Sequence, residues 1–197
     1  MTFRTRQSRR AARKFAVGRA LALLFLSSAL LALPHDLLSQ DDPPDEYQVK
    51  LAFLYNFTKF VEWPEQAFSS AKTPLVICVV GTDPFGKALE DDLATRRTAG
   101  HPITVRRLGV GGDFSGCHIT FVRAEERKHL AAILSRLNGH DVLTVGEMSG
   151  FLEGGGQVNF DFTAQSLHFN VNLVAVRQTR LKLSSKLLAL ARNLANP

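Results

Sequence analysis

The sequence predicts a single α/β domain, with a mixed central sheet of about six strands flanked by helices. Three observations lead to this prediction. Short apolar, β-branched runs alternate with helical patterns between residues 47 and 146, which is typical of parallel strands joined by helices. Two alternating runs, 157–162 and 166–171, then predict a β-hairpin. The remaining residues have helical periodicity, so the domain is expected to end in C-terminal helices.

The first helix is expected to run from Tyr47 to Val61, since Asp45 and Glu46 favour a helix start and Pro64 ends it. Strands are predicted at 74–81, 102–108, 117–122 and 141–146. Two further helices are expected between them, one capped by Asp83 with Pro84 at its first position and one over 124–139.

The N-terminal region carries most of the charge imbalance. Residues 1–40 hold seven of the 24 Lys and Arg residues and one of the 18 acids, so residues 41–197 hold 17 of each. The basic block precedes an apolar run of fourteen residues, 20–33, which is the pattern of a signal peptide, with a membrane anchor as the alternative. The expected organisation is a signal peptide and the start of a linker in 1–40, the linker in 41–46, and the domain in 47–197. A neutral domain excludes nucleic-acid binding as the main function.

The predicted first helix contains an unusual cluster of aromatic residues. Five of the residues in "LAFLYNFTKFVEWP" (51–64) are aromatic. On a helical projection two apolar faces appear, each about 80° wide, and a polar strip that includes Tyr55 and Lys59 remains between them. Core packing explains the apolar faces. Tyr55 and Lys59 are the candidates for contact with a partner.

The C-terminal segment "SSKLLALARNLA" (184–195) has the pattern of an amphipathic helix. Leu187, Leu190 and Leu194 are expected on one face of it. A last helix on the outside of a small domain can bury only one apolar stripe against the sheet, so some of its leucines stay exposed. Exposed apolar patches usually mark interaction sites. We therefore predict that these leucines contribute to a partner or dimer surface. The alternative is that the stripe belongs to the core.

No arrangement of residues indicates catalysis. No G-x-S-x-G or H-E-x-x-H motif is present, and no histidine pair has the spacing of a metal site on a helix. We therefore expect a protein that is not an enzyme and that needs no cofactor and no metal. One alternative is an exported small-molecule-binding protein. Asp83 and Glu147 would then bind the ligand, because both follow predicted strands and the carboxyl ends of parallel strands often bind ligands.

The two cysteines are Cys78 and Cys117. An even number in an oxidising compartment favours one disulfide. With the first three strands in the order 2-1-3, Cys78 and Cys117 would lie on neighbouring strands, within the roughly 4.4–6.8 Å between Cα atoms that a disulfide needs. Two free cysteines in the core are the alternative.

Several motifs resemble those of the YfiR family. They are "VKLAFLYNFTKFVEWPEQAF", "ICVVGTDPFG", "CHITFV", "VLTVGE…GFLEGGGQVNF", "VNLVAV" and "LKLSSKLLALAR", in the family's order and covering most of residues 47–194. The chain departs from the family at Gln157, where Met is common, and it lacks the second cysteine pair of some members.

The resemblance implies a periplasmic protein that represses a membrane-bound diguanylate cyclase by binding its periplasmic sensor region. Repression would lower cyclic-di-GMP and biofilm formation. The resemblance implies an outer-membrane lipoprotein as a second partner. It also implies a disulfide between Cys78 and Cys117. The sequence leaves open whether the protein forms a homodimer.

Overall fold

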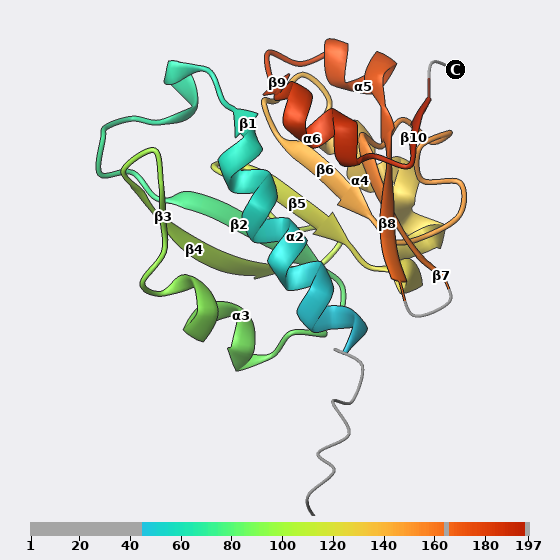
Figure 1. Ribbon diagram of the computed structural model, residues 1–197, viewed down its shortest axis with the longest axis horizontal. Coiled ribbons are helices and arrows are strands. Elements are labelled where there is room, and N and C mark those ends of the chain that lie inside the picture. The colour runs from blue at the N-terminus through green and yellow to red at the C-terminus, as the bar shows by residue number, and fades with distance from the viewer. Residues whose placement is uncertain (1–44, 164–165, 196–197) are drawn as a thin grey trace, which may run out of the picture. The chain divides into compact units, whose positions relative to one another are not determined.

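An eight-stranded mixed sheet with the order β10-β8-β7-β6-β5-β2-β4-β3 forms the centre of the protein (Figure 1). This computed structural model describes residues 45–163 and 166–195. The described residues belong to one compact unit, Pro43–Pro197. The predicted signal peptide (1–40) and most of the predicted linker (41–46) lie outside the described residues. The α/β class, the mixed sheet and the C-terminal hairpin and helices are confirmed.

The parallel part of the sheet follows the predicted apolar runs. Its strands are β2 (Leu75–Val80), β4 (His101–Leu108), β5 (Ile119–Val122) and β6 (Leu143–Gly146). All four pair in parallel, with β2 between β4 and β5. The predicted order of the first three strands is therefore correct. Every residue of β2, β5 and β6 is buried, which explains why these strands are continuous apolar or small-residue runs.

The hairpin extends the sheet on one side. It consists of β7 (Val158–Thr163) and β8 (Ser166–Asn172), which pair in antiparallel fashion, and β7 runs parallel to β6. Two short strands that the sequence did not predict form the edges, namely β10 (Asn193–Ala195) beside β8 and β3 (Arg97–Thr98) beside β4. A separate two-stranded pair joins β1 (Val61–Glu62) to β9 (Lys182–Leu183).

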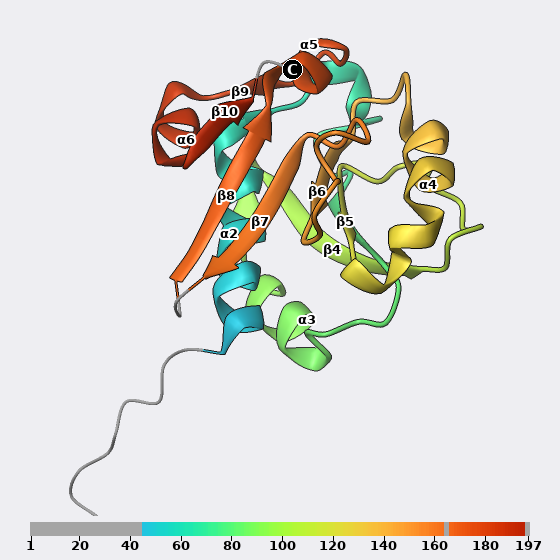
Figure 2. The same cartoon turned by 90° about the vertical axis from the view of Figure 1, so that its right-hand side faces the viewer.

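Helices cover both faces of the sheet, so the domain has three layers (Figure 2). Alternate side chains of β2 face the two opposite layers. Leu75, Ile77 and Val79 pack in the core that includes α2 (Glu46–Phe60). The intervening residues Val76, Cys78 and Val80 pack in a second, smaller core under α4 (Leu130–Leu137). Because successive residues of a strand face opposite sides, one apolar strand supports both layers.

The remaining helices are short. They are α3 (Lys87–Leu93), α5 (Leu173–Arg177), α6 (Ser185–Leu190) and the 3-10 helices η1 (Glu65–Ala67) and η2 (Ala124–His129). None of the helices in the described part of the chain combines the length and the apolar character needed to cross a membrane.

Two of the predicted helices differ in the structure. Asp83 does not cap α3, because Gly86 has a φ of 55° and α3 begins only after it. The carboxylate of Asp83 instead accepts a hydrogen bond from the Phe85 amide at 2.9 Å within the preceding turn. The helix predicted over 124–139 is divided into η2 and α4, since His129, the last residue of η2, leaves α-helical geometry (φ −104°, ψ 0°).

The helix predicted over residues 184–195 is shorter than expected. Helix α6 ends at Leu190, and residues 193–195 form strand β10, parallel to β8. The Arg192 amide donates to the Phe169 carbonyl at 2.9 Å, and the Arg192 guanidinium pairs with Asp161 at 3.2 Å. These contacts fix the chain in an extended course along the sheet edge, where backbone pairing replaces the expected helical turns.

The ring of Phe151 explains why residues 146 and 156 are glycines. A Cβ atom at Gly146 would lie 2.3 Å from the Phe151 ring, and one at Gly156 would lie 2.2 Å from it. Phe151 itself is fully buried in the smaller core. The glycine-rich loop that follows β6 therefore includes glycine where an aromatic ring occupies the space of a side chain.

Candidate functional site

The carboxylate of Glu147 is the centre of a buried cluster of charges. Glu147 follows β6, and its side chain is 4% exposed. Lys50 of α2 donates to it at 2.5 Å and Arg123, which follows β5, donates at 2.7 Å. The Ala124 amide donates to the same carboxylate at 3.2 Å. The predicted ligand-binding residue Glu147 is therefore held by protein groups on three sides.

Helix α2 supplies the other members of this cluster. Lys50 is 2% exposed and also pairs with Glu46, one turn earlier on the helix. The ring of Tyr47 lies 4.5 Å from the Lys50 Nζ and 4.9 Å from the Arg123 Cζ, and Arg123 also donates to the Tyr47 hydroxyl. Burial alone lowers the pKa of Arg123, but Tyr47 and Glu147 outweigh it and raise the pKa. Arg123 therefore stays charged.

Asp83 is paired in a similar way. Its carboxylate accepts from the Arg107 Nε at 2.7 Å, and Arg107 also binds Glu90 of α3. Hydrogen bonds with Glu90 and Asp83 raise the pKa of Arg107. Asp83 and Glu147 follow β2 and β6, as predicted, but β5 lies between these strands. Asp83 pairs with Arg107 and Glu147 with Lys50 and Arg123, and the described contacts do not join the two carboxylates into one site.

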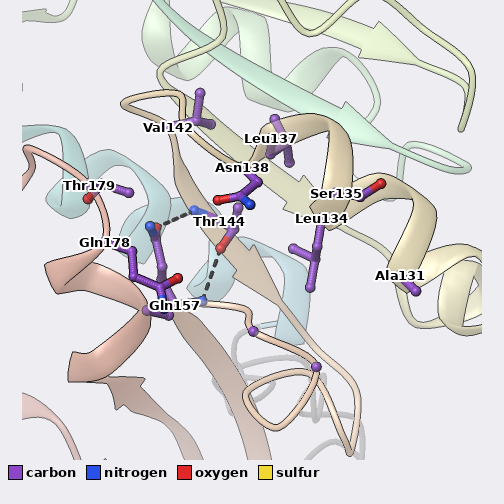
Figure 3. A pocket seen from close by; sticks show the side chains of 14 residues that line it. Ala131, Leu134, Ser135, Leu137, Asn138, Val142, Thr144, Gln157, Gln178 and Thr179 are labelled. Carbon is purple, nitrogen blue, oxygen red and sulfur yellow. Dashed lines mark hydrogen bonds between the residues drawn. The ribbon is translucent and has the colours of Figure 1, made fainter.

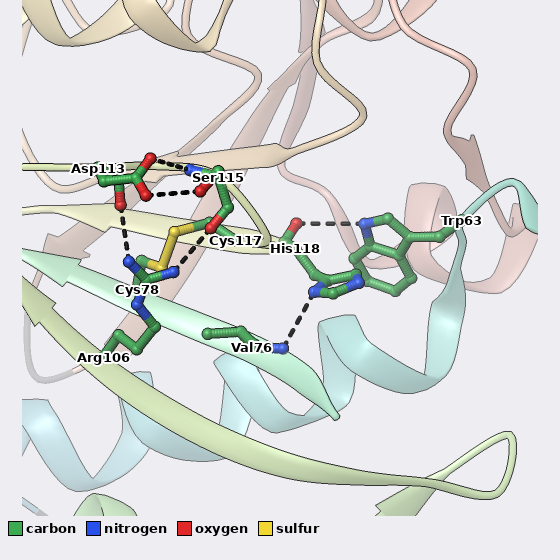
Figure 4. The surroundings of a disulfide bond; sticks show 8 residues. All are labelled: Trp63, Val76, Cys78, Arg106, Asp113, Ser115, Cys117 and His118. Carbon is green, nitrogen blue, oxygen red and sulfur yellow. Dashed lines mark hydrogen bonds between the residues drawn. A yellow bond between two sulfur atoms is a disulfide. The ribbon is translucent and has the colours of Figure 1, made fainter. Parts of the chain in front are cut away.

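The disulfide between Cys78 and Cys117 is present, with 5.8 Å between the Cα atoms (Figure 4). Both residues are buried. Cys117 lies just before β5, which begins at Ile119 rather than at Cys117 as predicted. Arg106 of β4 donates to the carbonyls of Asp113 and Ser115 at 2.8 and 2.7 Å and so holds the loop that leads to Cys117.

His118 lies next to the disulfide and is 3% exposed. Its Nδ1 accepts from the Val76 amide at 3.1 Å, and its Nε2 donates to the Ala67 carbonyl at 3.2 Å. This pair of bonds fits the neutral imidazole. Burial lowers the pKa of His118 below its usual range. Trp63, which lies in the segment after α2, donates its indole N–H to the His118 carbonyl at 3.2 Å. This bond connects that segment to the start of β5.

The aromatic helix is largely a core element. Phe57 is fully buried and packs on Phe53, Phe160 and Phe169, with ring centroids 5.5–6.3 Å apart. Tyr55 is half-buried. The Lys59 Nζ lies 4.1 Å and the Arg96 Cζ 4.3 Å from the centre of its ring. Burial raises the pKa of Tyr55, but Arg96 and Lys59 have the larger combined effect and lower it.

A groove of about 630 Å³ lies beside Lys59. Trp63, Phe68 and Leu75 contribute apolar walls, and Thr98 and His101 line it from the β3–β4 side. Phe68 stacks on His101 with 3.9 Å between the ring centroids. The predicted partner-binding residue Lys59 therefore has a concave surface next to it.

The predicted C-terminal leucine stripe is divided in the structure. Leu187 is 2% exposed and belongs to the main core, whereas Leu190 is 65% and Leu194 47% exposed. Leu194 lies on β10, at one edge of the sheet, and the Arg96 that contacts Tyr55 directly precedes β3, at the other edge. The five predicted partner-binding residues therefore do not form one surface.

Sequence reasoning missed Lys50 and Arg123, the two cations of the buried cluster. Lys50 and Glu147 are 97 residues apart, so no local pattern connects them. The position of Lys50 on a helix that is apolar over most of its circumference was the available indication, because a buried cation needs a partner.

Comparisons with known proteins support one assignment. A family model described as YfiR/HmsC-like matches residues 47–192, which is most of the chain. A search of curated proteins found no match.

Proposed function

Because the chain belongs to the YfiR/HmsC-like family, we propose that it is a periplasmic regulator, not an enzyme, that represses a membrane-bound diguanylate cyclase. It would bind the periplasmic sensor region of the cyclase and so lower cyclic-di-GMP and biofilm formation. The disulfide supports export, since disulfides persist in oxidising compartments such as the periplasm.

One structural observation carries the proposed mode of binding. Leu190 and Leu194 are the most exposed large apolar side chains of the described chain. Leu190 ends α6, and Leu194 lies on β10, whose outer edge has no strand partner in this part of the chain. An edge strand offers free backbone groups, and exposed leucines next to it add apolar area. Addition of an extended segment of the cyclase to this edge is a common mode of peptide recognition. We place the cyclase-binding surface here and leave out Leu187, which is buried.

The second surface consists of Tyr55, Lys59 and the groove beside them. It lies toward β3, at the other edge of the sheet, so a partner that covers β10 leaves it accessible. We assign it to a second protein contact. An outer-membrane lipoprotein or a second copy of the chain would both fit this assignment, and measurement of molar mass in solution distinguishes the copy from the lipoprotein.

The alternative function, ligand binding at Asp83 and Glu147, receives less support. Both carboxylates already bind cations of the protein, and the Glu147 side chain is almost fully buried. A ligand would have to displace Arg107 from the one or Lys50 and Arg123 from the other. Removing one partner of a buried ion pair costs about 3–5 kcal/mol, and this cost applies to Glu147, whose pair with Lys50 is buried.

The main test is deletion of the gene followed by measurement of cellular cyclic-di-GMP. Deletion should raise cyclic-di-GMP, and the wild-type gene should restore the low level. Leu194→Asp should fail to restore it while the protein remains folded and present in normal amount. Phe162→Asp is a matched control, because Phe162 is an exposed apolar residue (37%) near the turn of the β7–β8 hairpin, whereas β10 pairs with the opposite end of β8.

Two results would argue against the proposal. An unchanged level of cyclic-di-GMP in the deletion strain would contradict the repressor function. Full complementation by Leu194→Asp would leave the function in place but remove β10 from the binding surface. Co-purification of the sensor region of the cyclase with the wild-type protein, and its loss with Leu194→Asp, gives the direct measurement of binding.

A further inference from the structure

A polar cavity lies beside α4 (Figure 3). Its volume is about 340 Å³, at the small end of the range of roughly 300–1,000 Å³ that is typical of ligand pockets. Leu134 and Leu137 of α4 and Val142 provide apolar walls, and Thr144, Gln157 and Gln178 provide polar groups.

Gln157 is the residue that makes this cavity a built site. It is 4% exposed, and its Oε1 accepts from the Thr144 amide at 2.8 Å. The Thr144 amide can only donate, so the Oε1 must face β6 and the Nε2 must face away from it. Within the described chain no protein group accepts a hydrogen bond from this Nε2, although the side chain lines the cavity. Two N–H donors are thus directed to the cavity without a protein partner, so solvent or a ligand in the cavity can accept hydrogen bonds from them.

Thr144 adds a second donor. It is also 4% exposed and lines the cavity. Its Oγ1 accepts from the Gln157 amide at 3.0 Å, and the hydroxyl proton has no acceptor among the described residues. Figure 3 shows how the reciprocal bonds between Thr144 and Gln157 hold both side chains in place at the cavity. The donors are therefore fixed in position before any ligand binds.

The lining also restricts the charge of a ligand. None of the residues that line the cavity is charged. An anion would find no cation there, and it would lie by the C-terminal turn of α4, whose free carbonyl groups repel it. A cation would find no carboxylate.

We infer that this cavity binds a small uncharged molecule whose carbonyl or hydroxyl oxygens accept hydrogen bonds from Gln157 and Thr144. Apolar atoms of the same molecule would pack on Leu134 and Leu137. A molecule of monosaccharide size fits these requirements. The inference goes beyond the proposed repressor function and does not depend on it.

The experiment compares matched pairs of probes by titration calorimetry on the purified protein. N-acetylglucosamine is paired with glucosamine, which replaces the neutral amide by a cation. Glucose is paired with glucuronate, which adds an anion. At least one neutral probe should bind, with an affinity about tenfold or more above that of its charged counterpart.

Two substitutions on the exposed side of α4 locate the binding site. Ala131 lines the cavity, so Ala131→Trp should close it and weaken binding about tenfold or more. Ala132 is also exposed but does not line the cavity, so Ala132→Trp should bind like the wild type. Both positions lie outside the core, and the melting temperature of each variant checks that it is folded.

Three outcomes would overturn the inference. The first is that no neutral probe binds at ~10 mM, in which case the donors of Gln157 and Thr144 are bound to water alone. The second is equal affinity for the neutral and charged members of a pair. The third is the same affinity in Ala131→Trp and Ala132→Trp, whether retained or lost, because the ligand would then bind elsewhere or respond to helix substitution in general.

Discussion

The two layers that cover the sheet are stabilised in different ways. The layer that contains α2 holds an aromatic cluster around Phe57 and a larger set of buried aliphatic residues. The layer that contains α4 has the smaller core and includes the disulfide between Cys78 and Cys117. The difference indicates a division of roles. The larger layer is stabilised mainly by apolar packing, together with the buried ion pair of Lys50 and Glu147, and the covalent bond supports the layer with less apolar surface to bury.

Phe57→Ala should produce the largest loss of stability, because it breaks the larger layer at its centre. The ring is fully buried and stacks on Phe160 at 5.8 Å. Removing a buried Phe side chain typically costs about 3–5 kcal/mol. Urea unfolding followed by circular dichroism measures the effect. Phe162→Ala is the control, since Phe162 is 37% exposed and its truncation should cost far less. Equal losses in the two variants would contradict the central role of Phe57.

Removal of the disulfide should have the next largest effect. The bond joins residues 39 positions apart, and the chain-entropy model gives roughly 4 kcal/mol for a loop of this length. We expect a loss of about 2–4 kcal/mol for the double variant Cys78→Ala, Cys117→Ala, measured by urea unfolding without reductant. A reducing agent should lower the stability of the wild type and leave the double variant unchanged. Two reactive thiols in the unfolded, unreduced wild type would show that the bond does not form.

The pH dependence of stability should reveal His118, which connects the segment after α2 to β5. Its folded pKa is lowered by burial, so folding favours the neutral imidazole. The stabilising effect is therefore complete above the unfolded pKa of about 6.5 and is lost as the pH falls from there through the folded pKa. The slope that one proton produces is at most about 1.4 kcal/mol per pH unit. Unfolding at pH 7.5 to 5 measures it, and His118→Gln should flatten the curve. An unchanged slope in the variant would assign the dependence to other groups.

Leu194→Asp should have the smallest effect on stability. Leu194 is 47% exposed on an edge strand and belongs to neither layer's core. Surface substitutions away from special features usually change stability by less than about 0.5 kcal/mol. Thermal unfolding measures this change. A loss of several degrees would place Leu194 in the core and would make the expected relief of repression a consequence of unfolding.

Sequence reasoning located the elements whose pattern is local. The apolar run of β2 and the β7–β8 hairpin were predicted, because side-chain alternation and burial on two faces appear directly in the residue types. The order of the first three strands was an assumption about the topology, and the structure has that order. The start of α2 was predicted within one residue, since Asp45 accepts a hydrogen bond from the Tyr47 amide as a capping residue does.

What could not be predicted depends on contacts between distant residues. Helical periodicity continues past Leu190, but pairing with β8 and the Arg192–Asp161 ion pair favour a strand there. The site at Asp83 and Glu147 was located by strand ends alone, and only the structure shows that Arg107, Lys50 and Arg123 bind these carboxylates. Gln157 appeared in the sequence as the start of a predicted strand and as a departure from the family pattern, and the orientation of its donors depends on the position of Thr144.

The contact of Phe151 with Gly146 and Gly156 has a consequence for how the sequence can diverge. The ring occupies the space of both missing side chains, so alanine at either glycine is compatible with the fold only if residue 151 becomes smaller. A smaller residue at 151 would in turn leave a void between two glycines that only larger residues could fill. The three positions are therefore expected to covary among relatives, with compensated changes accumulating as double substitutions and single ones being removed by selection.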